Sequence, residues 1–312
     1  MTITQLEYII ALDLNRNFVN AAESCSVTQP TLSMQIQKLE DELGVKIFDR
    51  SKQPVVPTVI GETIINQAKN VLLEYSKIIE LVQDEKGIIK GDLRIGIIPT
   101  VAPYLIPRFL LIFLKKYPEV NLIVNELTTE MCIHHLKNDL IDCAIMASPI
   151  KDKSLTDNLL YFEEFVSYVS KTNKLFSKNT IKGSDLDLKE MWLLNEGHCM
   201  RNQVLNICGE RKKDTINARL EYQTGSVETL KRIVEQGSGV TILPELAIMD
   251  MSDDQMDLVR YFKSPAPIRE ISIFTHRNIV KKKLIKTLSD LIADCVPSKM
   301  KKKDKREIIK IV

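Results

Sequence analysis

The sequence has little that would direct it into or across a membrane. It contains no apolar run near the ~18 residues that a transmembrane helix needs. Its first apolar stretch, "LEYIIALDL", is short and carries acidic residues, so it does not fit a secretory signal peptide. We therefore expect a cytoplasmic protein, in which the six cysteines are reduced and any disulfide is transient.

A strong excess of charge is also absent, because 43 Lys and Arg oppose 41 Asp and Glu, which leaves a net charge of +2. Acids outnumber bases in residues 1–60, so bulk charge does not mark that region as a nucleic-acid-binding domain. The exception is segment 299–312, "KMKKKDKREIIKIV", with its many Lys and Arg. A basic arm that touches nucleic acid and a solvated tail both fit this composition, and the solvated tail is the commoner outcome.

Short helical patterns follow one another in the first 44 residues. The third of them begins after Thr28, a residue type that caps helices, has Pro30 in its first turn and stops at Gly44. Its apolar face carries Leu32, Ile36, Leu39 and Leu43. Its outward face near the start carries Gln29, Thr31, Ser33, Met34, Gln35 and Lys38.

A helix, a tight turn at residues 26–27 and a second helix with short polar side chains at its exposed start predict a helix-turn-helix. Gln, Ser and Thr side chains read base edges or phosphates, and a helix N-terminus itself favours phosphate. A small helical bundle with a polar surface fits the same residues. Composition and periodicity alone leave these two interpretations open.

Residues 61–86 contain no proline, and no glycine after Gly61. Apolar residues recur there at alternating steps of four and three: Ile64, Ala68, Val71, Tyr75, Ile78 and Val82. A seven-residue repeat lies on the adjacent edge: Ile65, Leu72 and Ile79. This heptad pattern predicts a helix that pairs with a second copy, and the alternative is an amphipathic helix that lies on its own domain. Segment 86–91, "KGIIKG", then reads as a hinge.

From residue 91 onward, strand and helix patterns alternate, which predicts an α/β domain with a mainly parallel sheet. A second such set begins after residue 160, and a late strand, "EISIFTHR", returns near the end. This arrangement resembles a two-lobed periplasmic-binding-protein fold, with a ligand cleft between the lobes. We expect lobe I to comprise 91–161 with 268–298, and lobe II to comprise 162–267.

A longer pattern in the first sixty residues is more specific than composition. It consists of Ala21–Ala22, Gln29–Pro30, Leu32–Ser33, Gln35–Ile36, Leu39–Glu40, Leu43–Gly44, Phe48, Arg50, Pro57–Thr58 and Gly61. This pattern resembles the DNA-binding domain of LysR-type transcriptional regulators. The resemblance implies a winged helix-turn-helix (1–60), a dimerisation linker helix with its hinge (61–90) and an effector domain (91–298). The basic tail (299–312) has no counterpart that we can assign.

The same resemblance implies which residues meet DNA. They are Gln29, Pro30, Thr31, Ser33, Gln35 and Lys38 in the recognition helix, and Arg50 in the wing "VKIFDRSKQPVVPT" as a phosphate contact. The implied partners are double-stranded promoter DNA with palindromic sites, RNA polymerase, and further copies of the chain in a homodimer or homotetramer.

The stretch "EGHCMRNQVLNICGE", residues 196–210, places Cys199 and Cys208 nine positions apart in a predicted helix. At about 100° and ~1.5 Å per residue, their side chains lie on opposite faces and about 13 Å apart along the axis. A disulfide needs Cα atoms within roughly 7 Å. Either the two thiols are unrelated, or they pair only when the helix is dismantled.

Within the LysR family, the set Gly197, His198, Cys199, Arg201, Gln203 and Cys208 resembles the branch that senses hydrogen peroxide. The resemblance implies that Cys199 is the peroxidatic thiol, that Cys208 resolves it in a reversible disulfide, and that the chain controls oxidative-stress genes. Asn202 stands where this pattern commonly has Asp. Chemistry supports the assignment, because a helix start with His198 and Arg201 nearby would lower a thiol pKa, and peroxide converts a thiolate to a sulfenic acid that a second thiol resolves.

The resemblance further implies that the hydroxyls of Thr100 and Thr129 hold the oxidant and that Arg269 is a nearby cation, although Thr128 or another arginine could serve. We expect Cys25 and Cys295 to be packing residues. Another group, Cys132 with His134 and His135, invites a metal, but structural zinc sites normally have four protein ligands and no further ligand is evident. We therefore expect neither a metal nor a cofactor.

Two other functions stay open. The first is a LysR-type regulator that senses a small organic ligand in the interlobe cleft, with Cys199 incidental. The second is a thiol peroxidase that turns peroxide over. The predicted helix-turn-helix argues against the enzyme, so we expect a DNA-binding regulator.

Overall fold

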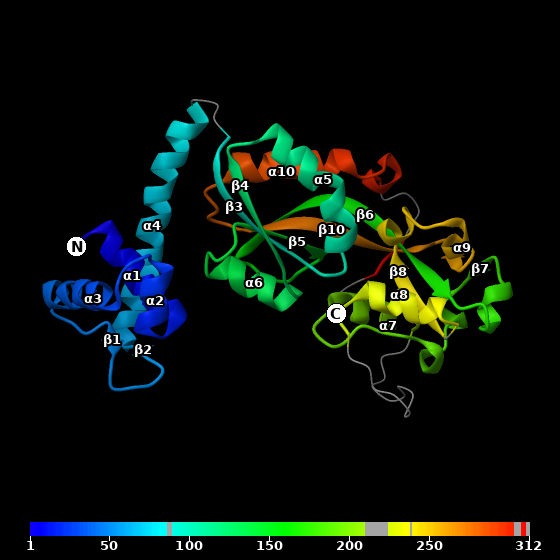
Figure 1. Cartoon of the computed structure of the whole chain (residues 1–312), viewed down its shortest axis with the longest axis horizontal. Helices are drawn as coiled ribbons and strands as arrows, with labels where there is room; N and C mark the ends of the chain where they lie inside the picture. The colour runs from blue at the N-terminus through cyan, green and yellow to red at the C-terminus, as the bar shows by residue number, and fades with distance from the viewer. Residues whose placement is uncertain (86–88, 210–223, 238, 303–306, 310–312) are drawn as a thin grey trace. The chain divides into compact units, whose positions relative to one another are not determined.

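The computed structural model covers the 312-residue chain and describes all of it except residues 86–88, 210–223, 238, 303–306 and 310–312 (Figure 1). The chain divides into two compact units, Met1–Ile88 and Ile89–Val312, each described here by itself. Among the described residues, every helix is too short or too polar to span a bilayer.

The first unit is a small helical domain with a two-stranded wing. Its elements are α1 (Ile3–Asn15), α2 (Phe18–Ser24), α3 (Gln29–Leu43), β1 (Phe48–Asp49) and β2 (Val56–Pro57). The helices share one hydrophobic core, and β1 pairs with β2 in antiparallel register. The expected winged helix-turn-helix is therefore present.

The predicted ends of α3 are confirmed, but one predicted core residue is wrong. Thr28 is the N-cap, and Gly44 closes the helix in the left-handed conformation with φ at 69°. Leu43, expected in the core, is 40% exposed. Glu40 takes the buried position one turn earlier and is only 1% exposed, so the last turn of α3 extends beyond the core.

The linker helix α4 (Val59–Glu85) begins slightly before the predicted start at Gly61. A Cβ at position 61 would lie 2.0 Å from the carbonyl oxygen of Ile47, so this helical turn packs against the wing only because residue 61 is glycine. The buried side chains of Ile65 and Ala68 join the core of the first unit. The start of α4 thus lies on its own domain, as the second of our two interpretations expected.

The later part of α4 differs. Its apolar stripe is exposed within the single chain, at 36% for Val71, 45% for Tyr75, 63% for Ile78 and 50% for Val82. The side chain of Ile79, part of the predicted heptad edge, lies outside the described residues, as does the first half of the predicted hinge, residues 86–88. An exposed stripe of this kind remains consistent with pairing to a second helix.

The second unit is built on one twisted mixed sheet. Its strands are β3 (Gly91–Ile97), β4 (Val120–Glu126), β5 (Cys143–Ser148), β6 (Leu155–Val169), β7 (Thr180–Ile181), β8 (Val240–Pro244), β9 (Val259–Phe262), β10 (Pro267–His276) and β11 (Glu307–Ile308). Their order is β4-β3-β5-β10-β6-β9-β7, with β8 beside β6 and β11 beside β10.

The sheet is not mainly parallel, which corrects our expectation. Strand β3 is parallel to β4 and β5, but β10 is antiparallel to β5 and β6, and β6 is antiparallel to β8 and β9. The long strand β6 carries the chain from lobe I into lobe II, and β10 brings it back beside β6. A strand that returns beside β6 is antiparallel to it. The alternation of strands and helices in the sequence does not reveal the direction of this returning strand.

Each of the two lobes has a hydrophobic core of its own. The lobe I core includes residues of α5 (Ala102–Lys116), α6 (Thr129–Lys137) and α10 (Lys282–Cys295). The lobe II core includes residues of α7 (Cys199–Ile207) and α8 (Val227–Glu235). Residues 191–195, "MWLLN", form no strand, and Met191 makes an isolated bridge to Val240.

Part of the basic tail is integrated into the second unit, so the expectation of a solvated tail is wrong for that part. Met300 is fully buried, and β11 adds to the sheet beside β10. The segments 303–306 and 310–312 lie outside the described residues.

Candidate functional site

Cys199 and Cys208 stand at the two ends of one intact helix. Cys199 is the first residue of α7, and Cys208 is its C-cap, with a backbone N–H that donates to the Val204 carbonyl at 3.1 Å. All six cysteines lie in the described part of the chain, and none of them forms a disulfide. Joining these two thiols therefore requires α7 to be taken apart, as the helical spacing predicts.

The two thiols occupy different surroundings. Cys199 is 7% exposed and belongs to the lobe I core, although the next residue, Met200, belongs to the lobe II core. The Sγ of Cys208 lies 3.7 Å from the Sδ of Met191, which packs against the lobe II core. The start of α7 therefore contacts both lobes, and any rearrangement of α7 changes both cores.

Burial dominates the electrostatics of the Cys199 thiol and raises its pKa. The Thr129 hydroxyl, the charge of Arg269 and the N–H groups of Cys199 and Met200 at the helix start each lower that pKa without offsetting the burial. The resting group at neutral pH is thus a thiol, held where a cation and a hydroxyl can stabilise the thiolate.

The cation that acts on Cys199 is not one of its neighbours in sequence. Arg201 donates from Nη1 to the carbonyl oxygen of Leu194 at 2.7 Å. Burial lowers the pKa of His198, which favours a neutral imidazole. We expected both side chains to lower the thiol pKa as cations, but the structure gives that effect to Arg269.

Arg269 is fully buried and joins two of the predicted site residues. Its Nη1 donates to the Thr100 hydroxyl at 3.0 Å, and its Nη2 donates to the Thr100 carbonyl at 3.1 Å. Its Nε donates to Glu163 at 2.8 Å, and Glu163 also accepts from the backbone N–H of Leu246 at 3.0 Å. The structure thus brings together Thr100, Arg269 and, through the charge of Arg269, Cys199.

Glu163, the carboxylate that balances this buried arginine, was not among the residues predicted from the sequence. A signal was present, because a buried Arg requires an acidic partner and "FEEFVSYV" places acids inside an apolar strand. The choice between Glu163 and Glu164 needs the sheet register, in which Arg269 pairs with Glu163 across β10 and β6.

The structure also distinguishes Thr129 from Thr128. Thr128 is the N-cap of α6, and its hydroxyl accepts from the N–H of Met131 at 3.4 Å. The Oγ1 of Thr129 is buried and lacks a hydrogen-bond partner of normal geometry among the described residues. A hydroxyl of this kind beside a thiol and a buried cation is suited to a small polar guest.

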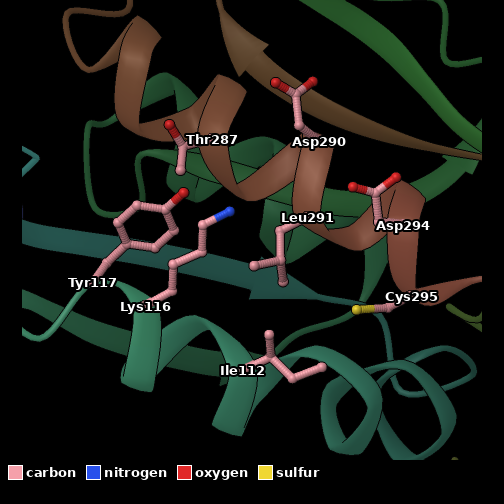
Figure 2. A pocket seen from close by; sticks show the side chains of 8 residues that line it. All are labelled: Ile112, Lys116, Tyr117, Thr287, Asp290, Leu291, Asp294 and Cys295. Atoms are coloured by element: carbon pink, nitrogen blue, oxygen red, sulfur yellow. The ribbon is translucent and has the colours of Figure 1, made fainter.

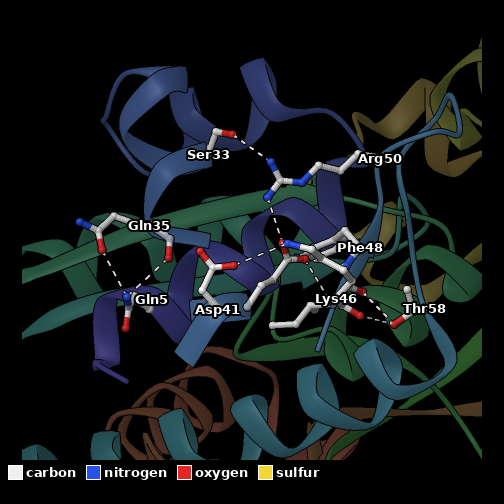
Figure 3. A network of polar contacts seen from close by, with 10 residues as sticks. Gln5, Ser33, Gln35, Asp41, Lys46, Phe48, Arg50 and Thr58 are labelled. Carbon is white, nitrogen blue, oxygen red and sulfur yellow. Dashed lines mark hydrogen bonds and ion pairs between the residues drawn. The ribbon is translucent and has the colours of Figure 1, made fainter. Parts of the chain in front are cut away.

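In the first unit, a network of polar contacts that includes Ser33 and Arg50 joins the recognition helix to the wing (Figure 3). Glu40 accepts from the backbone N–H groups of Ile47 and Phe48 at 2.9 and 3.2 Å, and from Arg50 Nη2 at 3.2 Å. Arg50 also donates from Nη1 to the Ser33 hydroxyl at 3.4 Å. The guanidinium therefore lies between helix and wing, and the sequence pattern alone did not predict this role of Glu40.

The predicted DNA-contact residues of α3 are exposed to different extents. Gln29, Pro30 and Lys38 are exposed, and Thr31, Ser33 and Gln35 are half-buried. The Thr31 hydroxyl bonds to that of Thr28 at 2.8 Å, and the Oε1 of Gln35 accepts from Gln5 at 3.3 Å. Several of these side chains are thus already oriented by neighbours in the isolated chain.

A surface pocket of about 400 Å³ lies elsewhere, between α5 and α10 (Figure 2). Its lining residues are Ile112, Lys116, Tyr117, Thr287, Asp290, Leu291, Asp294 and Cys295. It shares no residue with the predicted redox site. Cys132, considered as a metal ligand, is fully buried and donates to the Leu127 carbonyl at 3.7 Å, and no metal-binding group of His, Cys, Asp or Glu is found among the described residues.

Comparison with known proteins covers both units. The model for the bacterial regulatory helix-turn-helix protein of the lysR family matches residues 3–62, and that for the LysR substrate binding domain matches residues 86–295. The hydrogen peroxide-inducible genes activator of Haemophilus influenzae is 34% identical over 278 residues, which is 88% of this chain and 90% of that protein.

Solved structures agree. A full-length OxyR mutant from Pseudomonas aeruginosa matches with a TM-score of 0.77 and 34% identity, over 95% of this chain and 99% of that one. An H2O2-bound OxyR mutant from Corynebacterium glutamicum matches with a TM-score of 0.62 and 25% identity, over 94% of this chain and 92% of that one. These matches confirm the expected fold class and a DNA-binding regulator rather than an enzyme. The chain belongs to the LysR family of transcriptional regulators, in the branch that contains OxyR.

Proposed function

We propose that this chain senses hydrogen peroxide through a reversible Cys199–Cys208 disulfide and thereby controls oxidative-stress genes. The observation that carries the proposal is the position of two thiols at opposite ends of α7, one of them buried beside Arg269 and Thr129. The name of the Haemophilus relative and the H2O2 in the Corynebacterium structure support the choice of oxidant.

The first chemical step takes place at Cys199. Peroxide binds beside the thiol, where the hydroxyls of Thr129 and Thr100 and the Arg269 guanidinium hold its oxygens. The sulfur attacks the nearer oxygen, an S–O bond forms, and the O–O bond breaks. The thiol proton goes to the departing oxygen, which leaves as water, and a sulfenic acid remains at Cys199. Arg269 stabilises the thiolate that burial disfavours.

The second step closes the switch. The sulfur of Cys208 attacks the sulfenic sulfur of Cys199, an S–S bond forms, the S–O bond breaks, and a second water leaves. In sum, two thiols are oxidised by two electrons and one peroxide is reduced to two waters. Because an intact helix holds the two sulfurs apart, α7 must unwind, and its contacts with both lobe cores change.

The output of the switch is DNA binding. In this proposal the exposed start of α3 enters the major groove, Arg50 contacts the phosphate backbone beside the wing, and the exposed stripe of α4 pairs with a second copy. A dimer or tetramer then reads palindromic half-sites in the cytoplasm and acts through RNA polymerase.

Thiol titration with equimolar peroxide tests the proposal. The parent chain should lose two thiols quickly, and Cys199→Ser should lose none within the same time. A regulator that senses a small organic ligand would lose none in either form. A thiol peroxidase would instead consume many equivalents of peroxide in the presence of a thiol reductant.

A further inference from the structure

The end of the described chain reaches the helix that carries both thiols. After α10, a 3-10 turn at Ser298–Lys301 leads the chain along lobe I, where Met300 is fully buried and Lys299 pairs with Glu245. Strand β11 then runs parallel to β10, and the N–H of Ile309 donates to the Ile268 carbonyl at 2.8 Å. The tail therefore packs first on the lobe I core and then reaches lobe II.

Its last described residue contacts α7 directly. Ile309 is 9% exposed and belongs to the lobe II core, and its carbonyl accepts from Nε2 of Gln203 at 3.1 Å. Gln203 is fully buried in α7, between Cys199 and Cys208. The Oε1 of Gln203 lacks a partner among the described residues, so its amide is held through Nε2.

The same segment contacts the strand that carries the buried cation. Ile308 is in register with Ile268, and Arg269 follows directly in β10. Segment 307–309 therefore touches both the helix with the two thiols and the strand with Arg269.

We propose that segment 307–309 is a latch that holds α7 in its helical, reduced form. The latch thereby sets the rate of closure, which is the reaction of the Cys199 sulfenic acid with Cys208 to form the disulfide. This inference rests on the proposed function, because it concerns the second step of that chemistry. Unwinding α7 carries Gln203 away from the Ile309 carbonyl, so their hydrogen bond stabilises the helix and is lost on the way to closure. The first step needs no unwinding, so the latch leaves it unchanged.

Separate measurement of the two steps in full-length protein tests the latch. Gln203→Met keeps the length of the side chain and removes the donor, and Ile309→Asp places a charge in the lobe II core. The matched control is Glu307→Ala, because Glu307 is an exposed residue of the same strand. Closure is followed by quenching and peptide mapping after a pulse of peroxide, and sulfenic acid formation is followed by trapping in the Cys208→Ser background.

We expect closure about tenfold faster in Gln203→Met, in line with the loss of one buried hydrogen bond. Ile309→Asp should also accelerate closure, because a charged side chain displaces residue 309, and the carbonyl that Gln203 binds, from the lobe II core. Sulfenic acid formation should stay within about twofold of the parent rate in both variants. Glu307→Ala and the conservative Ile309→Val should close at the parent rate. If Ile309→Asp fails to fold, Gln203→Met alone decides.

Closure at the parent rate in Gln203→Met overturns the latch and leaves the proposed function in place. Equal acceleration of both steps also overturns it, because the variants would then merely expose Cys199. A parent chain that forms no Cys199–Cys208 bond removes the proposed function, and the latch with it, so the two failures are distinguishable.

Discussion

Glu163 accepts a hydrogen bond from the Nε of Arg269 at 2.8 Å, and both side chains are almost completely buried. Glu163 holds in place the Arg269 guanidinium, whose charge lowers the pKa of the Cys199 thiol. Glu163 also neutralises part of that positive charge. Any change in this pair should therefore alter the reactivity of the Cys199 thiol, although both residues are far from Cys199 in the sequence.

Neutralising Glu163 and neutralising Arg269 should shift the pKa of the Cys199 thiol in opposite directions. Glu163→Gln leaves the Arg269 charge unopposed, so we expect a lower Cys199 pKa and faster oxidation at neutral pH. Arg269→Gln removes the cation, so we expect a higher pKa and slower oxidation. The rate of peroxide consumption against pH in the Cys208→Ser background reports both shifts. Each variant should cost about 3–5 kcal/mol of stability, since breaking a buried ion pair leaves one charge without its partner. Shifts of the same sign in both would contradict the assignment.

The His198 ring should keep its position only if residue 225 is glycine. A Cβ at residue 225 would lie 2.8 Å from the Nε2 of His198. We expect Gly225→Ala to lower the free energy of unfolding by about 1–3 kcal/mol, as overpacking does, and to displace the residue before Cys199. Denaturant unfolding measures this loss. His198→Ala in the Gly225→Ala background should restore much of the stability, and no restoration would show that the strain lies elsewhere.

Several of these features could be read from the sequence, and the reasons are local. Gly44 ends α3, and the spacing of Cys199 and Cys208 places them at two ends of α7, because caps and helical periodicity depend on near neighbours. Glu163 and Arg269 are 106 residues apart, and their meeting depends on strand register. The direction of β10 and the docking of the tail also depend on tertiary pairing, which periodicity does not encode.

The recognition helix can be tested at single residues. Gln29→Ala or Ser33→Ala should weaken specific DNA binding by about 1–3 kcal/mol, the value of a lost base contact. Footprinting on a palindromic site at fixed salt measures the loss. Gln37→Ala, at an exposed position of α3 outside the predicted contact set, is the matched control. Unchanged footprints from both Gln29→Ala and Ser33→Ala would remove the assignment of α3.

Self-association should depend on the exposed part of α4. Tyr75→Asp with Ile78→Asp places charges on the exposed stripe and leaves the buried residues Ile65 and Ala68 untouched, so the first unit should still fold. We expect a species of lower mass in light scattering and weak binding to a single half-site. A variant that keeps the parent mass would place the main association surface in the effector domain.

Replacing Cys199 and replacing Cys208 should change the response to peroxide in different ways. Cys199→Ser should bind DNA and ignore peroxide, because the attacking sulfur is gone. Cys208→Ser should consume one equivalent and stop at a sulfenic acid that a trapping reagent labels. Equal reaction rates in Cys199→Ser and Cys208→Ser would contradict the division of roles between them.

Non-reducing peptide mapping of the parent chain after brief exposure to equimolar peroxide tests the central claim most directly. We predict one new linked peptide pair, joining Cys199 to Cys208, that disappears on reduction. Because the bond cannot form across an intact helix, α7 should become sensitive to protease at the same time. A bond from Cys199 to any other cysteine, or a fully reduced Cys199 after exposure, would contradict the account.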